Sequence, residues 1–266
     1  MSESQTCVEL PVIDLSQPLS ESILCSLCAA CNEWGFFYIT NHGVSDEFYQ
    51  KLISIADELF RLPQDTKIKV GISSYVPRFT ASPFFESFKL SGPDFSASAQ
   101  LLTEALLGHH NTQFRINNYS PRDSNEEVEG LGKHTDISCV TILFQDKLGG
   151  LQMRSKGGEW MDIRPCENAL VVNIGDFMQA WSNERLRSAE HRVVLRQNVK
   201  RFSMAFFWSY VDDEEIYAPS EVVGEGNVRL YRTFSTKEYR MFRATGARGT
   251  YEKVGANVKE FAGIVG

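Results

Sequence analysis

The stretch ISCVTILFQDKLGGLQMRSKGGEWMDI, residues 137–163, alternates short apolar runs with turn-forming residues. Its runs Ile137–Phe144, Leu151–Arg154 and Trp160–Ile163 have the length and the β-branched or aromatic content of strands. Gly, Asp and Ser between the runs predict tight polar turns. Short strands joined in this way are typical of β-sandwiches and barrels, so we expect a jelly roll built around this stretch.

The same pattern continues on both sides of residues 137–163. Four further runs predict strands: Phe114–Tyr119, Ala169–Ile174, His191–Leu195 and Arg201–Tyr210. The segment Asp212–Pro219 then leaves the sheet, and Ser235 to about Gly246 predicts a basic terminal helix. The chain is therefore expected to be mainly β from about residue 112 to residue 220.

The N-terminal part has a different, mixed pattern. Leu10–Leu15 and Gly35–Thr40 predict strands, while Glu21–Glu33 and Ser45–Leu62 have the spacing of amphipathic helices. From Gly71 to Asn111 the pattern is weak and predicts an irregular cover with one or two helical turns over Leu101–Leu107. We expect an N-terminal α/β region over 1–111, a β core over 112–220 and a C-terminal extension over 221–266, in one structural unit.

Composition excludes several classes of function. The 266 residues are 42% hydrophobic and 23% charged, with a net charge of -7, so no basic field attracts nucleic acid or anionic lipid. No run approaches the roughly 20 apolar residues of a membrane helix, and the N-terminus lacks the pattern of a secretory signal. We expect a monomer of the cytoplasm, or of the cytoplasm and nucleus, whose partner is a small-molecule substrate.

Three of the six cysteines follow the spacing Cys25-x-x-Cys28-x-x-Cys31, which also occurs in iron–sulfur sites. A cluster needs a fourth thiolate nearby, and none follows in the sequence. The three lie in the helical pattern of Glu21–Glu33 among apolar residues. We therefore interpret them as core cysteines.

The strongest chemical pattern is His134-Thr135-Asp136 followed by His191, with Arg201-Phe202-Ser203 ten residues later. Two imidazoles and a carboxylate form the facial triad of non-haem Fe(II) enzymes, although zinc also accepts this set. Near the start of a strand, His134 and Asp136 would project from one face. Arg201 and Ser203 also share a strand face and suit a carboxylate, whereas the plain alternative for them is a surface salt bridge.

Several motifs occur together in one order along the chain, and this series resembles the plant Fe(II)/2-oxoglutarate-dependent dioxygenases, which include gibberellin and auxin oxidases. In chain order the motifs are PVIDL (11–15), WGFF (34–37), NHGV (41–44), NNYSP (117–121), HTD (134–136), GGLQ (149–152), NIGD (173–176), SAEHRV (188–193) and RFS (201–203). The resemblance extends over nearly the whole chain. It implies a double-stranded β-helix of the jelly-roll, cupin-like kind with flanking helices.

The resemblance also implies a chemistry. His134, Asp136 and His191 would hold Fe(II), and 2-oxoglutarate would chelate the metal through its C1 carboxylate and C2 keto oxygen. Arg201 and Ser203 would bind the C5 carboxylate with help from Asn117 and Tyr119. With O2 as oxidant and ascorbate as an accessory reductant, such an oxidoreductase couples decarboxylation of 2-oxoglutarate to hydroxylation or desaturation of a small hydrophobic plant metabolite, such as a gibberellin.

Other polar and aromatic residues have plainer interpretations. His42 lies in a turn and is expected to bond the backbone, and the adjacent His109 and His110 point to opposite faces and so should not share a metal. Asp176 suits a pocket position or, at least as well, a turn or cap, and residues 185–190 suit a solvated rim. About half of an aromatic set should be core; Phe85 and Phe207 are the expected substrate contacts within Phe84, Phe85, Phe88, Phe206, Phe207 and Trp208.

The chain departs from the family between Gln100 and Phe114, where members usually have several dozen more residues of helix. A missing helix would expose apolar surface, whose burial is worth roughly 25 cal/mol per Å². Two alternatives to an active dioxygenase follow: a catalytically impaired short variant acting as a binding protein, and an ascorbate-dependent oxidase of the same fold.

Overall fold

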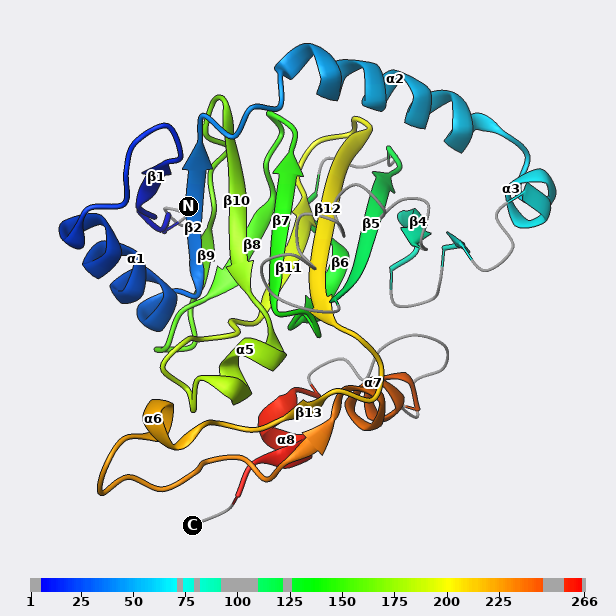
Figure 1. Cartoon of the computed structure of the whole chain (residues 1–266). Helices are drawn as coiled ribbons and strands as arrows, with labels where there is room; N and C mark the ends of the chain where they lie inside the picture. The colour runs from blue at the N-terminus through cyan, green and yellow to red at the C-terminus, as the bar shows by residue number, and fades with distance from the viewer. Residues whose placement is uncertain are drawn as a thin grey trace.

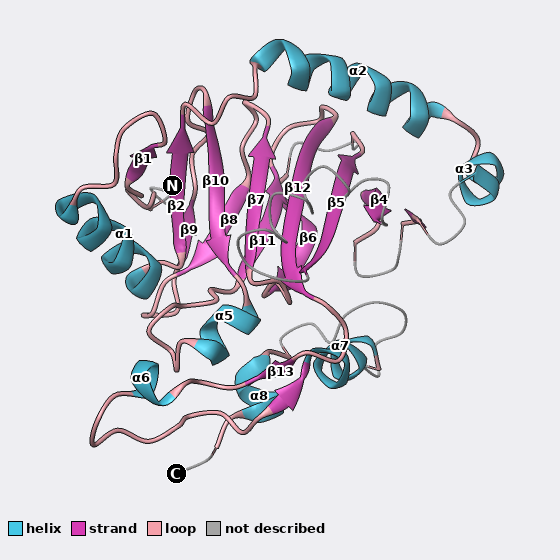
Figure 2. Cartoon of the chain, viewed as in Figure 1, coloured by secondary structure: helices cyan, strands magenta, loops and turns pink. Residues whose placement is uncertain are grey.

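The computed structural model describes residues 6–70, 74–78, 82–91, 110–121, 126–245 and 256–264, and its centre is a pair of β-sheets (Figures 1 and 2). In spatial order the larger sheet contains β1 Val12–Asp14, β2 Phe36–Thr40, β10 Ala169–Ile174, β7 Val140–Gln145, β12 Arg201–Tyr210, β5 His110–Tyr119, β4 Phe85–Ser91 and β3 Tyr75–Val76. The smaller sheet contains β6 Val128–His134, β11 His191–Leu195, β8 Leu151–Arg154 and β9 Trp160–Asp162. All neighbours except β1 and β2 are antiparallel, and the expected jelly roll is confirmed.

Helices flank the two sheets. Helix α1, Glu21–Glu33, lies beside the β1–β2 edge, and α2, Asp46–Arg61, crosses the end of the larger sheet and leads into α3, Gln64–Val70 (Figure 1). A C-terminal group lies at the other end of the sheets in the same view. It contains α5 Asp176–Trp181, α6 Ser220–Val223, α7 Thr236–Ala244 and α8 Val258–Ala262, with the small hairpin of β13 Glu215–Ile216 and β14 Phe234–Ser235.

The predicted helix starts are confirmed by their caps. The side chain of Ser20 accepts a hydrogen bond from the backbone N–H of Ile23, and Ser45 accepts one from Phe48 in the same way. In α7, Ser235 and Glu238 form a reciprocal capping box. Such caps satisfy backbone N–H groups that have no partner within a helix, so these residues fix where each helix begins.

Apolar side chains fill the space between the sheets and beneath the helices. Phe36, Tyr38, Leu151 and Met153 belong to the cluster between the two sheets. A second cluster joins Ala56 and Phe60 of α2 to the outer face of the larger sheet, at Phe88, Ile116, Phe202 and Met204. The helices thus cover the outer face of the larger sheet, while its inner face looks toward the smaller sheet.

After Gly71 the sequence pattern is weak and irregular cover was expected, and the structure corrects this expectation. Its described part contains β3 and β4, which pair with each other and extend the larger sheet. The alternation was hidden because both faces of β4 are buried: Phe85 is 2% exposed and the neighbouring Glu86 is also 2% exposed. The helical turns expected over residues 101–107 and the residue His109 lie outside the described residues.

Two further expectations needed correction, and one is confirmed. Of the three cysteines of α1, Cys25 and Cys28 are exposed and Cys31 is buried; none of the six cysteines forms a disulfide. The segment 185–190 is not simply a solvated rim, since Arg187 donates to the backbone oxygens of residues 33 and 154. The turn role of His42 is confirmed, because its Nδ1 accepts from the N–H of Val44 at 3.2 Å.

Among the described residues, no helix combines the length and the apolar content needed to cross a bilayer.

Candidate metal centre and carboxylate pocket

The two histidines of the HxD…H pattern are brought together by strand pairing. His134 is the last residue of β6 and His191 the first of β11, and the two occupy paired positions in the antiparallel register. Asp136 follows two residues after the end of β6, so the motif closes a strand instead of opening one as expected. The strand β6 itself was not predicted, because its sequence VEGLGKH contains two glycines and little apolar alternation.

The three side chains converge on one point. Oδ1 of Asp136 lies 3.7 Å from Nε2 of His134 and 3.6 Å from Nε2 of His191, and all three ligand atoms lie within 4.8 Å of one another. Nδ1 of His134 is 2.7 Å from the carbonyl oxygen of Gly132, and Nδ1 of His191 is 3.1 Å from that of Ala189. Each carbonyl accepts the Nδ1 proton of its imidazole, which leaves both Nε2 lone pairs directed at the point of convergence.

The carboxylate of Asp136 is oriented from behind. Its Oδ2 accepts hydrogen bonds from Oγ1 of Thr141 at 2.6 Å and from Nδ2 of Asn173 at 2.9 Å, so Oδ1 faces the imidazoles. Burial acts to raise the pKa of Asp136, but His191, His134 and these two donors together hold the pKa below its ordinary value. The donor set is therefore two imidazoles and one ionised carboxylate, a set that suits a divalent transition metal.

A buried network holds Thr135, the residue between the two ligands of the motif. Its Oγ1 donates to Oδ2 of Asp176 at 2.9 Å, and Nη2 of Arg243 donates to its carbonyl oxygen at 2.8 Å. Nη1 of Arg243 also lies 2.9 Å from Oδ2 of Asp176, and Tyr239 donates to the same oxygen at 2.5 Å. Arg243 thereby connects helix α7 to the loop that contains Thr135 and Asp136. A turn or cap role alone does not describe Asp176, and no local sequence pattern indicated its partner Arg243, 67 residues away.

A cavity of about 700 Å³ lies between the sheets and includes the three converging side chains in its wall. Side chains from β4, β5 and β12 line the same cavity at alternate positions, because successive residues of a strand point to opposite faces. On β12 these are Arg201, Ser203, Ala205, Phe207 and Ser209.

Arg201 and Ser203 pair across the sheet with Tyr119 and Asn117, so all four predicted residues form one patch of the wall. Nδ2 of Asn117 donates to Oγ of Ser203 at 3.1 Å, and the guanidinium of Arg201 lies over the ring of Tyr119 at 4.7 Å. Arg201 is only 3% exposed and Nε donates to the carbonyl oxygen of Gly149 at 2.6 Å.

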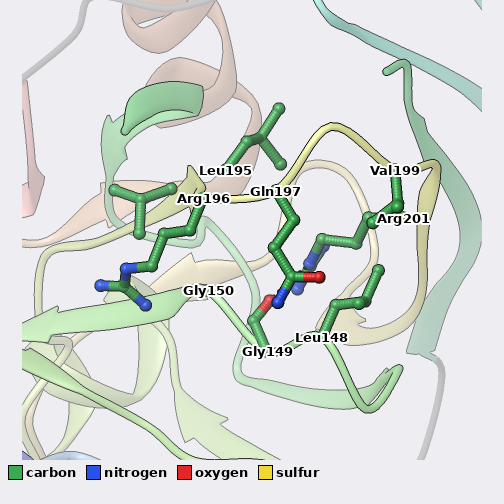
Figure 3. A pocket seen from close by; sticks show the side chains of 9 residues that line it. Leu148, Gly149, Gly150, Leu195, Arg196, Gln197, Val199 and Arg201 are labelled. Atoms are coloured by element: carbon green, nitrogen blue, oxygen red, sulfur yellow. Dashed lines mark hydrogen bonds between the residues drawn. The ribbon is translucent and has the colours of Figure 1, made fainter. Parts of the chain in front are cut away.

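The terminal nitrogens of Arg201 decide what this patch can bind. Neither Nη1 nor Nη2 has a hydrogen-bond partner among the described residues, and Oδ1 of Asn117 has none either. On its outer side the guanidinium reaches a small space of about 20 Å³ beside Gly149 and Gly150 (Figure 3). Buried guanidinium nitrogens without an acceptor are costly, so the site fits an anion with two oxygens for the planar fork. The alternative of a surface salt bridge is wrong, because Arg201 is buried.

The aromatic set divides between cavity and core. Phe85 and Phe207, the expected substrate contacts, both line the cavity, where the ring of Phe85 packs on Tyr119 at 5.4 Å. Phe88 instead packs on Phe60 of α2, on the other face of the sheet. Phe36, which was not singled out from the sequence, lies edge-on to His191 at 5.6 Å. Apolar rings therefore surround both the converging side chains and the polar patch.

Comparison with known proteins agrees with this geometry. Residues 111–209 match the 2OG-Fe(II) oxygenase superfamily, and residues 10–124 match a domain described as non-haem dioxygenase in morphine synthesis N-terminal. A gibberellin 20-oxidase-like protein of Arabidopsis thaliana is 43% identical over 97% of this chain and 98% of its own length. Gibberellin 2-beta-dioxygenase 8 of the same plant is 33% identical over 97% of this chain and 86% of its own.

Solved structures of dioxygenases are also similar to this chain over most of its length. The rice dioxygenase for auxin oxidation is 30% identical, with a TM-score of 0.74 over 88% of this chain and 95% of its own. JOX2, solved in complex with 2OG, Fe and JA, is 25% identical, with a TM-score of 0.75 over 90% of this chain and 86% of its own.

The alignment with the gibberellin 20-oxidase-like protein extends over 320 positions, whereas this chain has 266 residues, so at least 54 aligned positions have no counterpart here. The expected shortening relative to the family is therefore confirmed. The high coverage of both chains shows that the loss is internal. With the fold, the convergent triad and these similarities together, the chain belongs to the 2OG-Fe(II) oxygenase superfamily and is an oxidoreductase that uses Fe(II) and 2-oxoglutarate.

Proposed function

We propose that His134, Asp136 and His191 hold the Fe(II), and that Arg201 and Ser203 bind the C5 carboxylate of 2-oxoglutarate. The observation that carries this assignment is the pair of buried, unpartnered Arg201 nitrogens facing the cavity that also contains the three convergent ligand atoms. Asn117 and Tyr119 complete the carboxylate site: Asn117 orients the Ser203 hydroxyl, and the ring of Tyr119 supports the guanidinium.

The protein residues supply position and charge. Thr141 and Asn173 hold the carboxylate of Asp136 toward the imidazoles, and the Nδ1 contacts fix both rings. The apolar wall, including Phe36 and Phe85, excludes water from the reacting atoms, which strengthens each electrostatic contact inside. Iron, when bound, supplies the oxygen chemistry that couples decarboxylation of 2-oxoglutarate to oxidation of the second substrate.

We infer that the second substrate is a small, largely apolar plant metabolite of the gibberellin class, which is hydroxylated or desaturated. The inference is supported by the 43% identity to a gibberellin 20-oxidase-like protein and by a cavity of about 700 Å³ with aromatic walls. Phe85 and Phe207 are the proposed apolar contacts. We further propose that the enzyme acts as a monomer in the cytoplasm, or in the cytoplasm and nucleus.

The test is succinate formation from 2-oxoglutarate by protein purified anaerobically and loaded with Fe(II), across gibberellin and other hormone substrates. We expect substrate-stimulated succinate release that His134→Ala and Arg201→Met each abolish. His42→Ala serves as the matched control, because this histidine only bonds a turn. Undiminished turnover in either site variant would refute the residue assignment, and turnover that needs ascorbate but no 2-oxoglutarate would favour the ascorbate-dependent oxidase.

A second candidate function is a binding protein without turnover. The absence of at least 54 aligned positions relative to the gibberellin 20-oxidase-like protein favours it. It predicts that 2-oxoglutarate binds with the metal present while no substrate raises succinate release.

A further inference from the structure

A second group of cations lines the same cavity, one step along the strands from the proposed 2-oxoglutarate site. Lys89 of β4 and Arg115 of β5 occupy directly paired positions, and both side chains are part of the cavity wall. Arg115 lies two residues from Asn117 on the same face of β5, which corresponds to about 7 Å along the strand.

These two cations are not neutralised within the described part of the chain. The side chain of Lys89 makes no hydrogen bond or ion pair there, and the side chain of Arg115 donates only to Oε1 of Gln113, at 3.0 Å. Nε of Arg115 is buried without a partner. Two further arginines of this wall, Arg240 and Arg243, differ, because Arg240 is paired with Asp212 and Arg243 with Asp176.

Their placement is unfavourable without a ligand. Like charges directly opposite each other on neighbouring strands repel, and partly buried charges lose solvation. Burial, together with the charges of Arg115 and Arg240, lowers the pKa of Lys89. Among the described residues that line the cavity, Asp136 and Asp212 are the only acidic ones, and each already has its own partners.

The surroundings of the pair suit an organic acid. The guanidinium of Arg115 lies 5.5 Å from the ring centroid of Phe207, so an apolar surface adjoins the cations. A molecule with an apolar body and one carboxylate could place its body on this ring and its charge between Lys89 and Arg115. An anion bound at Arg201 cannot also bind Lys89 and Arg115, because Arg201 pairs with Tyr119, four residues further along β5 than Arg115.

We propose that Lys89 and Arg115 bind a carboxylate of the organic substrate, so that the enzyme selects acids over the corresponding neutral esters. This inference rests on the proposed function, in which 2-oxoglutarate occupies Arg201 and Ser203. The pair acts in substrate selection and takes no part in holding the metal or the co-substrate.

The test measures binding by calorimetry to full-length protein holding Mn(II) and 2-oxoglutarate under nitrogen, where no turnover occurs. The probes are gibberellic acid, indole-3-acetic acid and the methyl ester of each. We expect at least one acid to bind about tenfold or more tightly than its ester, which corresponds to one charge-assisted hydrogen bond of about 1.4 kcal/mol. Lys89→Met and Arg115→Met should each remove this preference and leave ester binding within about twofold.

Lys51→Met on the exposed face of α2 is the matched control and should retain the preference. If Arg115→Met does not fold, Lys89→Glu still tests the proposal. Its carboxylate repels an acid, so this variant should reverse the preference toward the ester. Absence of any acid preference in the wild type, or its retention in both methionine variants, overturns the proposal, as does an equal loss of 2-oxoglutarate affinity. Failure of the wild type to bind 2-oxoglutarate at all would instead refute the proposed function.

Discussion

The buried ion pair of Asp176 and Arg243 allows a prediction with a defined magnitude. Asp176 is fully buried and Arg243 is 3% exposed, and their charged atoms lie 2.9 Å apart. Arg243→Met removes the cation and leaves the carboxylate with neutral hydroxyl donors, among them those of Thr135 and Tyr239. Breaking a buried pair from one side typically costs about 3–5 kcal/mol, a large share of the roughly 5–15 kcal/mol that stabilises a domain.

Urea unfolding of the metal-free protein measures this loss directly. We expect Arg243→Met to lower the free energy of unfolding by about 3–5 kcal/mol with little change in the slope against urea. The double variant Asp176→Asn, Arg243→Met should be less destabilised than the sum of its single changes, because no unpaired charge remains. Lys259→Met is the control: its ion pair with Glu184 has a lysine side chain that is 70% exposed, so it should contribute less than about 1 kcal/mol.

The same network predicts an effect on the metal, since Arg243 also holds the carbonyl oxygen of Thr135 between the two ligands of the motif. The variant should bind metal about 10–100-fold more weakly, as is usual when supporting contacts of ligands are lost. A loss of stability below about 1 kcal/mol, or additive effects in the double variant, would refute the reasoning that this pair is buried and coupled.

Three further outcomes are expected. Burial acts to raise the pKa of Glu86, but the hydrogen bond from Lys67 and its other donors hold the pKa below 4.5. The carboxylate therefore stabilises the fold above that pH and loses this effect as the pH falls through the lowered pKa. Glu86→Gln should flatten the acid side of the curve of unfolding free energy against pH. Gly150→Ala should lower stability by more than about 1 kcal/mol and weaken 2-oxoglutarate binding, because φ is +87° and the added Cβ would lie 2.2 Å from the carbonyl oxygen of Val194; an unchanged urea midpoint would contradict this. Metal at 100 times its Kd should stabilise the wild type by about 2.7 kcal/mol and chelation should reverse it, whereas Asp136→Ala should show no such shift in thermal unfolding.

The sequence predicted the parts of the fold that depend on local chemistry. The Ser20 and Ser45 caps are short-range signals, and both helices begin where these residues indicate. The strands around residues 137–163 were also recognisable, because apolar runs alternate with turns. By contrast, β4 was missed because the face of the strand that lines the cavity contains Lys89 and the other face contains the buried Glu86. Period-two alternation is visible only when one face is apolar and the other is solvated.

The site shows the same division. His134, Asp136 and His191 could be proposed from spacing and donor chemistry, and the structure brings their ligand atoms within 4.8 Å. The network of Asp176 and Arg243 could not be found, since it depends on where helix α7 docks and not on any local pattern. Lys89 and Arg115 were equally hidden, because only the register of β4 with β5 places them side by side.

The larger sheet separates helix α2 from the cavity. Residues of β12 alternate: Phe202 and Met204 pack in the cluster with α2, whereas Arg201 and Ser203 line the cavity on the opposite face. On α2 itself Phe48 and Ile55, seven residues apart and so on one side of the helix, are 52% and 55% exposed. This side of α2 therefore exposes apolar surface to solvent. Because the sheet lies between α2 and the cavity, any loss of cover there lowers stability without removing a group that binds metal or co-substrate.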